Sequence, residues 1–327
     1  VDALFVLRFI IPIFVAMSSV IMYVFMRRLG ASPLTSFLGS LAYSLALPRV
    51  FPVSHPMPGA LAELFLISLY FLHVEAYRNK RILYIELFLA SLPFALAHHL
   101  TQFVFIASIC ALSIVHKLYG FEEKSLKDFL VFSVSFFSFV FYWFSVPEFE
   151  QIIKDALNIG RQEITLLSII LFVVYALVFM VIPPKLRFRR ITHNLDYTQI
   201  LIRFGIYTVV LVIFFIISMC FGVPGTDIKI RPITTLFILP TLIIGFSAYI
   251  GWLKIKSKEE SIPILSWILA IALLAIYGVI TKSTVFIPYR FAQYIWTPVS
   301  ILIGIGLGDA LGKIMRIVDV RPHFKKY

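Results

Sequence analysis

Apolar segments of about 16 to 24 residues recur along almost the whole chain, and this recurrence limits the folds it can adopt. A membrane-spanning helix needs about 20 apolar residues, so each segment is predicted to be such a helix. We expect an all-α polytopic integral membrane protein with about eleven transmembrane helices, forming one transmembrane domain over residues 1–327. The predicted spans are residues 3–26, 33–52, 58–76, 82–97, 100–118, 128–146, 164–182, 198–221, 232–253, 261–281 and 291–312.

The composition excludes a water-soluble domain. Hydrophobic residues make up 60% of the chain and charged residues only 14%, whereas about a quarter of a soluble domain is charged. The net charge of +12 could suggest nucleic acid, but the basic residues lie between long apolar runs. There they set orientation and meet anionic lipid head groups, so we expect membrane lipids and no nucleic acid as partners.

Basic residues are concentrated in alternate connections between the predicted spans. Cytoplasmic loops are enriched in Lys and Arg, so these connections are predicted to be cytoplasmic in a multi-pass protein of the cell membrane. The alternation leaves the N-terminus outside and the C-terminus in the cytoplasm, and an outside start suggests that another span precedes Val1. The basic connections contain Arg27 and Arg28; Arg78, Lys80 and Arg81; Lys117, Lys124 and Lys127; Lys185, Arg187, Arg189 and Arg190; Lys254, Lys256 and Lys258; and, in the tail, Lys313, Arg316, Arg321, Lys325 and Lys326.

The sharpest polar motif is His98-His99-Leu100-Thr101-Gln102, which follows the short predicted span 82–97 on the extracytoplasmic side. Short helices near a cavity can place polar groups inside the membrane boundary, so His98, His99 and Gln102 are candidate substrate-binding residues. The alternative is a hydrated hairpin tip whose imidazoles face solvent or head groups.

Two more candidates lie near the outer start of the third span. His55 precedes Pro58 and Gly59, which suit the start of a helix, and a helix N-terminus favours phosphate. Glu63 lies inside the span, where a carboxylate is costly unless it is paired or faces water. The alternative for His55 is a histidine in a proline-stiffened loop that faces solvent.

The last predicted span begins with Pro288-Tyr289-Arg290 among aromatic residues. A guanidinium can bind phosphate through two parallel hydrogen bonds, and aromatic rings can hold a sugar face, so Tyr289 and Arg290 are candidate substrate-binding residues. Arg231, next to Pro232, is a weaker candidate of the same kind. Both arginines can equally be read as interfacial anchors.

Two further features give less specific predictions. The histidines leave a divalent cation open as a cofactor, although no metal-binding spacing occurs in the sequence and no other cofactor is indicated. Residues 147–163 mix apolar and charged positions at helical spacing, which predicts an amphipathic segment in the outer interface.

Three parts of the chain resemble the GT-C glycosyltransferases, polytopic membrane enzymes that take a sugar from a polyprenyl-phosphate carrier on the extracytoplasmic side. These parts are the turn Arg27-Arg28-Leu29-Gly30-Ala31-Ser32-Pro33, the hairpin with His98-His99-Leu100-Thr101, and Arg290 at the last span. With the spans that these motifs adjoin, the resemblance extends over about half of the chain.

The resemblance implies direct displacement at the anomeric carbon, in which a carboxylate deprotonates the acceptor and cationic groups stabilise the departing lipid phosphate. It gives Arg290 the role of phosphate clamp, with His55, His98 and His99 lining the pocket. The family's catalytic acid lies in its first outer loop, which would end near Val1, so Asp2 is the only visible acid for that role.

Two other functions stay open. A transporter or lipid flippase would place polar groups near the bilayer midplane, where the sequence offers only Glu63, Glu86 and Arg203. The third reading is a non-catalytic membrane subunit that scaffolds a membrane protein partner.

Overall fold

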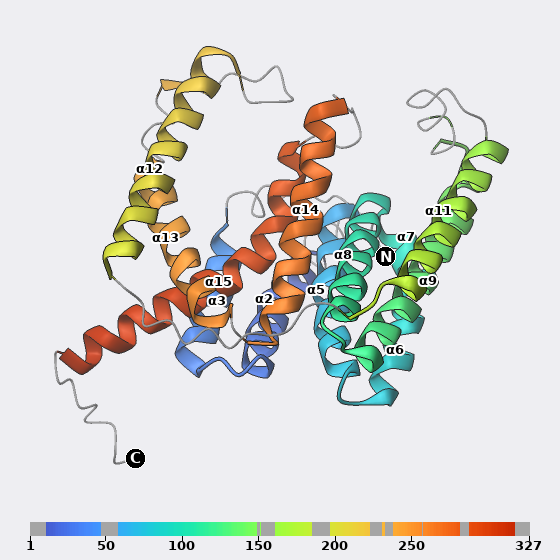
Figure 1. The fold of residues 1–327 in the computed structure, drawn as a ribbon, viewed down its shortest axis with the longest axis horizontal. Coiled ribbons are helices and arrows are strands. Elements are labelled where there is room, and N and C mark those ends of the chain that lie inside the picture. The colour runs from blue at the N-terminus through green and yellow to red at the C-terminus, as the bar shows by residue number, and fades with distance from the viewer. Residues whose placement is uncertain are drawn as a thin grey trace.

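In a computed structural model, every regular element of the described part of the chain is a helix (Figure 1). The structure describes residues 11–46, 58–148, 151, 161–184, 197–222, 231–232, 238–256, 258–281 and 288–317. The helices are α2 (Ile11–Arg28), α3 (Pro33–Leu45), α5 (Pro58–Ala76), α6 (Lys80–Ala90), α7 (Leu92–Ala97), α8 (His99–Leu118), α9 (Glu122–Trp143), α11 (Arg161–Val181), α12 (Tyr197–Cys220), α13 (Ile238–Ile255), α14 (Ser261–Thr281) and α15 (Pro288–Ile317).

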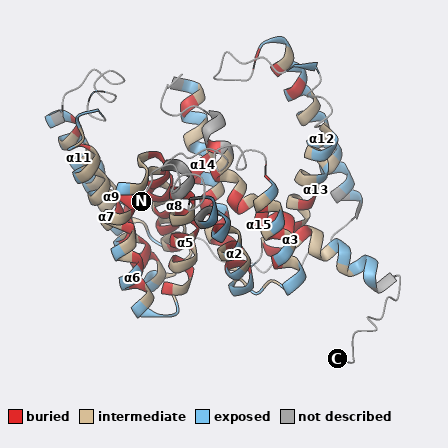
Figure 2. Cartoon of the chain, turned by 180° about the vertical axis from the view of Figure 1, so that it is seen from behind, coloured by how far each residue is buried: buried red, intermediate tan, exposed pale blue. Residues whose placement is uncertain are grey.

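The helices have the length and surface of a membrane protein. Within the described residues, seven are long and apolar enough to cross a bilayer: α8, α9, α11, α12, α13, α14 and α15. Large apolar side chains cover the outer faces of α11 and α12, which lie at the two sides of the molecule (Figure 2). Such surfaces are stable in lipid and not in water, so the chain is a helical membrane protein.

The core lies between α2, α5, α8, α9, α14 and α15 (Figure 2). Its largest fully buried side chains are aromatic and include Phe94, Phe105, Phe291 and Tyr294. Tyr70 stacks on Trp267 with 3.5 Å between ring centroids, which joins α5 to α14. Aromatic burial therefore ties the first half of the chain to its last two helices.

Helix α15 crosses α3 and α13 through glycines. A Cβ added at Gly304 would lie 2.6 Å from Cα of Gly39, and one at Gly306 would lie 1.9 Å from the carbonyl oxygen of Ser247. Small residues let helix backbones approach this closely, which is a common way for membrane helices to associate.

Two predicted spans have different bounds in the structure. The span 33–52 is helical only over the 13 residues of α3, and residues 47–52 lie outside the described part. The span 82–97 is divided at Ser91 into α6 and α7, because Pro93 in the first turn of α7 cannot donate a backbone hydrogen bond. This break produces the short helix α7, which precedes the double histidine.

Helix ends near the basic connections follow from their sequence. Helix α2 stops at Gly30, which has a φ of 84°. The amide of Gly30 donates to the carbonyl of Arg27, and that of Ala31 to the carbonyl of Met26. This glycine-terminated arrangement satisfies the last carbonyls of a helix. Ser32 then caps α3, and Pro33 begins it.

Four of the basic connections, those between α2 and α3, α5 and α6, α8 and α9, and α13 and α14, meet at one end of the bundle, which we call the basic end. Arg28 lies 3.6 Å from Glu75, which joins the α2–α3 and α5–α6 connections. Lys124 forms an ion pair with Glu259, which joins the α8–α9 and α13–α14 connections. Helix α8 runs about 30 Å from His98 to Lys117 at the normal rise, so the double histidine lies at the opposite end.

Candidate functional site

The double histidine forms the start of α8. His98 is extended, with φ −171° and ψ 125°, and its Nδ1 accepts a hydrogen bond from the amide of Thr101 at 3.3 Å. The hydroxyl of Thr101 also lies 3.0 Å from Nδ1. A ring nitrogen that accepts these bonds carries no proton, so the neutral His98 ring is protonated at Nε2. His98 is therefore the cap of α8 as well as a candidate ligand-binding residue.

A buried hydrogen bond connects this helix start to the last helix. The hydroxyl oxygens of Thr101 and Tyr294 lie 2.9 Å apart, although the residues are 193 positions apart in sequence. Since the Thr101 hydroxyl donates to His98, its oxygen accepts from Tyr294. Both residues are buried at 1% exposure or less. The start of α8 is thus fixed against α15.

Gln102 fixes the same helix start against α9. Its side-chain nitrogen donates to the carbonyl of Ser135 at 3.2 Å, and its oxygen accepts from Nε1 of Trp143 at 3.3 Å. The rings of His99 and Trp143 meet edge to face, with 5.1 Å between centroids. We call His98, Thr101, Gln102, Trp143 and Tyr294 the hairpin network.

The other predicted site residues are only partly described. Glu63 is buried, at 5% exposure, in α5. The neighbouring Phe65 stacks on Phe94 of α7, so α5 passes beside the hairpin. Arg231 is exposed and no described contact brings it to the hairpin network. Asp2, His55 and most of residues 147–163 lie outside the described residues, as do the side chains of Tyr289 and Arg290.

A second polar group, which we did not predict, lies near the basic end. His73 of α5 is within 2.7 Å of Glu86 of α6 through Nδ1, and within 2.9 Å of Asp128 of α9 through Nε2. His116 of α8 lies 2.7 Å from the other oxygen of Asp128. With Tyr77, whose hydroxyl donates to Asp128 at 2.7 Å, these residues form what we call the acid–histidine cluster.

The acid–histidine cluster lies away from water. The side chains of His73, Glu86, His116 and Asp128 are at most 1% exposed. If both carboxylates are ionised, His73 donates from both ring nitrogens and is the cation between them. Burial, and then the charge of Asp128, raise the pKa of Tyr77 well above its ordinary value, so its hydroxyl remains a donor. A charged group of this kind can hold or pass a proton.

One acceptor of the cluster is left over. Among the described residues, Oε2 of Glu86 is buried and has no hydrogen-bond partner. A buried, unsatisfied carboxylate oxygen is costly, and protonation of Glu86 or a bound water would satisfy it. Glu86 is therefore the member of the cluster at which a proton is most easily added.

The sequence carried some signal for this group. His73 and Tyr77 are four residues apart, which places them on one helix face. Glu86 stands inside an apolar run, where an ionisable residue marks a functional candidate. However, His73, His116 and Asp128 lie within two turns of basic connections, where an interfacial position explains them equally well.

Neither polar group is a metal site in the structure. Within the described ranges, no three or more His, Cys, Asp or Glu side chains are arranged so that they could hold a metal ion. In the acid–histidine cluster, the nitrogen–oxygen distances of 2.7 to 2.9 Å are direct hydrogen bonds.

The fold and these two groups define the class of protein: a helical membrane protein with a neutral polar network at one end of its bundle and a buried charged cluster near the other. The chain matches no model of a known protein family, and no curated protein is similar to it. Its function is therefore inferred from geometry and chemistry.

Proposed function

We propose that the protein is a GT-C-like glycosyltransferase that moves a sugar from a polyprenyl-phosphate carrier to an acceptor on the extracytoplasmic face. In this proposal the chain has about eleven spans, with its N-terminus outside and its C-terminus in the cytoplasm. The acceptor and the carrier lipid would enter at the end of the bundle opposite the basic connections.

One observation carries the proposal, namely the hydrogen bond between Thr101 and Tyr294. It joins the hairpin of the double histidine to the helix that Arg290 opens, and these are two of the three segments that resemble the family. Arg290 is four residues before Tyr294 in α15, and positions four apart in a helix share one face. This arrangement supports a shared site that contains the imidazoles and the guanidinium.

The roles follow from the chemistry of each group. Arg290 would bind the lipid phosphate through two parallel hydrogen bonds and stabilise its charge as the sugar leaves. His98 and His99 would line the sugar pocket, with His55, Gln102, Arg231 and Tyr289 as further contacts. A carboxylate, with Asp2 and Glu63 as the candidates in this chain, would accept the proton of the acceptor hydroxyl.

The test measures both binding and transfer. Full-length protein in lipid nanodiscs is given radiolabelled polyprenyl-phosphate sugar and acceptor lysate, and both bound donor and transferred label are counted. Arg290→Ala should lower both by at least tenfold, the usual scale of a lost charged hydrogen bond. Arg203→Ala is the matched control, because Arg203 is an exposed arginine on α12 that donates to Tyr249. Donor binding unaffected by Arg290→Ala and His98→Ala, with no label transferred, would contradict the proposal.

A second candidate function is proton-coupled transport of a solute or lipid, and the acid–histidine cluster favours it. Ionisable side chains inside membrane helices commonly belong to proton relays. Proteoliposomes with an imposed pH gradient and a trapped pH dye test this function. Proton entry that Glu86→Gln abolishes would support transport, and identical traces for the wild type, Glu86→Gln and empty liposomes would exclude it.

A further inference from the structure

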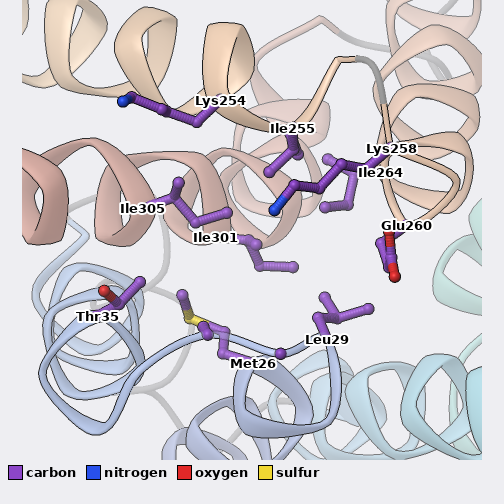
Figure 3. Close-up of a pocket in the computed structure, with 12 residues that line it drawn as sticks. Met26, Leu29, Thr35, Lys254, Ile255, Lys258, Glu260, Ile264, Ile301 and Ile305 are labelled. Atoms are coloured by element: carbon purple, nitrogen blue, oxygen red, sulfur yellow. The ribbon is translucent and has the colours of Figure 1, made fainter. Parts of the chain in front are cut away.

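A pocket of about 180 Å³ opens at the basic end, between the α2–α3 turn, the α13–α14 turn and α15 (Figure 3). Its floor is apolar and its rim is polar. Apolar side chains from α2, the α2–α3 turn, α13, α14 and α15 form the floor: Met26, Leu29, Ile255, Ile264, Ile301 and Ile305. The rim carries Thr35, Lys254, Lys258 and Glu260. A ligand that fits this surface has a polar head and an apolar part.

The charges at the rim favour an anionic head. Asp309 lies 3.0 Å from Lys254 and 3.0 Å from Lys313, so two lysines share one carboxylate and leave one positive charge uncompensated. Lys258 extends its ammonium group over the apolar floor, while Glu260 lies at the far side of the pocket (Figure 3). Among the described residues, Lys258 has no ion pair, whereas Lys117, Lys124 and Lys127 each have one.

A hydrogen-bond donor, the hydroxyl of Thr35, also lines the pocket, on the side opposite Lys258 (Figure 3). The Thr35 hydroxyl accepts from Ser32 at 2.9 Å, so its own proton is available to an oxygen in the pocket. Gly30 also lines the pocket, and a Cβ added there would point into open space, with no atom within 4 Å. The ammonium group and the hydroxyl at the mouth of this apolar pocket suit a phosphate ligand better than a carboxylate ligand, because a phosphate group has more acceptor oxygens.

We propose that this pocket binds the phosphate head group of an anionic lipid, with the first carbons of the lipid chains on the isoleucine floor. The basic end of a membrane protein meets anionic head groups when it faces the cytoplasm, and each lysine near such a surface adds to the attraction. The apolar floor favours a lipid over free phosphate, because free phosphate has no apolar part that could contact the floor. The pocket shares no residue with the hairpin network and does not depend on the proposed glycosyl transfer.

The test uses the purified full chain in nanodiscs that contain phosphatidylglycerol, or only zwitterionic phosphatidylcholine, and counts retained lipids by native mass spectrometry. Lys258→Gln should lower phosphatidylglycerol retention about fivefold, the factor for one lysine near an anionic surface. Lys256→Gln is the matched control, because it removes the same charge from the same turn but does not line the pocket. Thr35→Val should weaken retention by a smaller factor.

A second arm separates the two sources of phosphate. Detergent-purified protein is titrated with inorganic phosphate by calorimetry, with and without Lys258→Gln. Phosphatidylglycerol retention that depends on Lys258, without phosphate binding, supports the lipid. Phosphate binding that depends on Lys258, without selective lipid retention, assigns the pocket to free phosphate and overturns the lipid assignment. Equal effects of Lys258→Gln and Lys256→Gln in both arms overturn the site altogether.

Discussion

The hairpin network and the acid–histidine cluster both connect helices that are distant in sequence, but they do so with different chemical groups. Each joins distant segments through polar side chains, most of which are buried; His98 and Trp143 of the hairpin network are partly exposed. The hairpin network does so with hydroxyls, an amide, an indole and one imidazole that acts as an acceptor. The acid–histidine cluster uses two carboxylates and two imidazoles at hydrogen-bond distance.

The difference lies in what happens when one member is lost. In a neutral network, removal of one group leaves its partner with a single unmet hydrogen bond, which costs about 1–3 kcal/mol. In a charged cluster, removal of one partner leaves a buried charge without compensation, which costs about 3–5 kcal/mol. Removal of one member should therefore destabilise the protein more in the acid–histidine cluster than in the hairpin network, although the hydrogen-bond distances of the two groups are similar.

The largest expected effect is that of Asp128→Ala. Asp128 lies at hydrogen-bond distance from three side chains, His73, Tyr77 and His116, and its removal takes the carboxylate away from all three inside the bundle. We expect a loss of about 3–5 kcal/mol in the free energy of unfolding. Denaturant unfolding in detergent, followed by tryptophan fluorescence, measures the change.

Glu123→Ala is the matched control for that loss. It removes a carboxylate from the same helix, and Glu123 is exposed and, among the described residues, forms an ion pair only with Lys127 four residues on. Exposed pairs contribute little to stability, so this variant should unfold close to the wild type. If Asp128→Ala unfolds together with Glu123→Ala, the acid–histidine cluster does not hold α5, α8 and α9 together.

The sequence predicted the position of most helices because apolar length is a local property. The shortness of the span before His98 was also predicted, but its division at Ser91 into α6 and α7 was not. Gln102 was expected at the same site as the histidines and lies with them. These predictions needed only neighbouring residues.

What the sequence left open depends on helix rotation and long-range pairing. His73 and Asp128 are 55 residues apart, and Thr101 and Tyr294 are 193 apart, so no local pattern connects them. Near helix ends, a histidine that faces the core and one that faces head groups look alike in a sequence. The acid–histidine cluster was therefore not predicted. At the last helix, Tyr289 and Arg290 were predicted as site residues, whereas Tyr294, about one turn later, was not.

The smallest expected effect tests whether the hydrogen bond between Thr101 and Tyr294 is a link in its own right. Thr101→Val and Tyr294→Phe each remove one hydroxyl while they keep most of the side-chain shape. Each should cost about 1–3 kcal/mol because the remaining hydroxyl is buried. Thr208→Val is the control, since the Thr208 hydroxyl donates only to the carbonyl of Phe204 in its own helix.

The double variant then gives the coupling between the two hydroxyls. Hydrogen bonds between membrane helices contribute about 0.6 kcal/mol on average in such cycles, with about 1.7 kcal/mol at the upper end. We expect a value toward the upper end, because the bond is buried and continues to His98 at the start of α8. Strictly additive losses would mean that packing alone holds α15 against the hairpin, and the proposed shared site would then lose the hydrogen bond on which it rests.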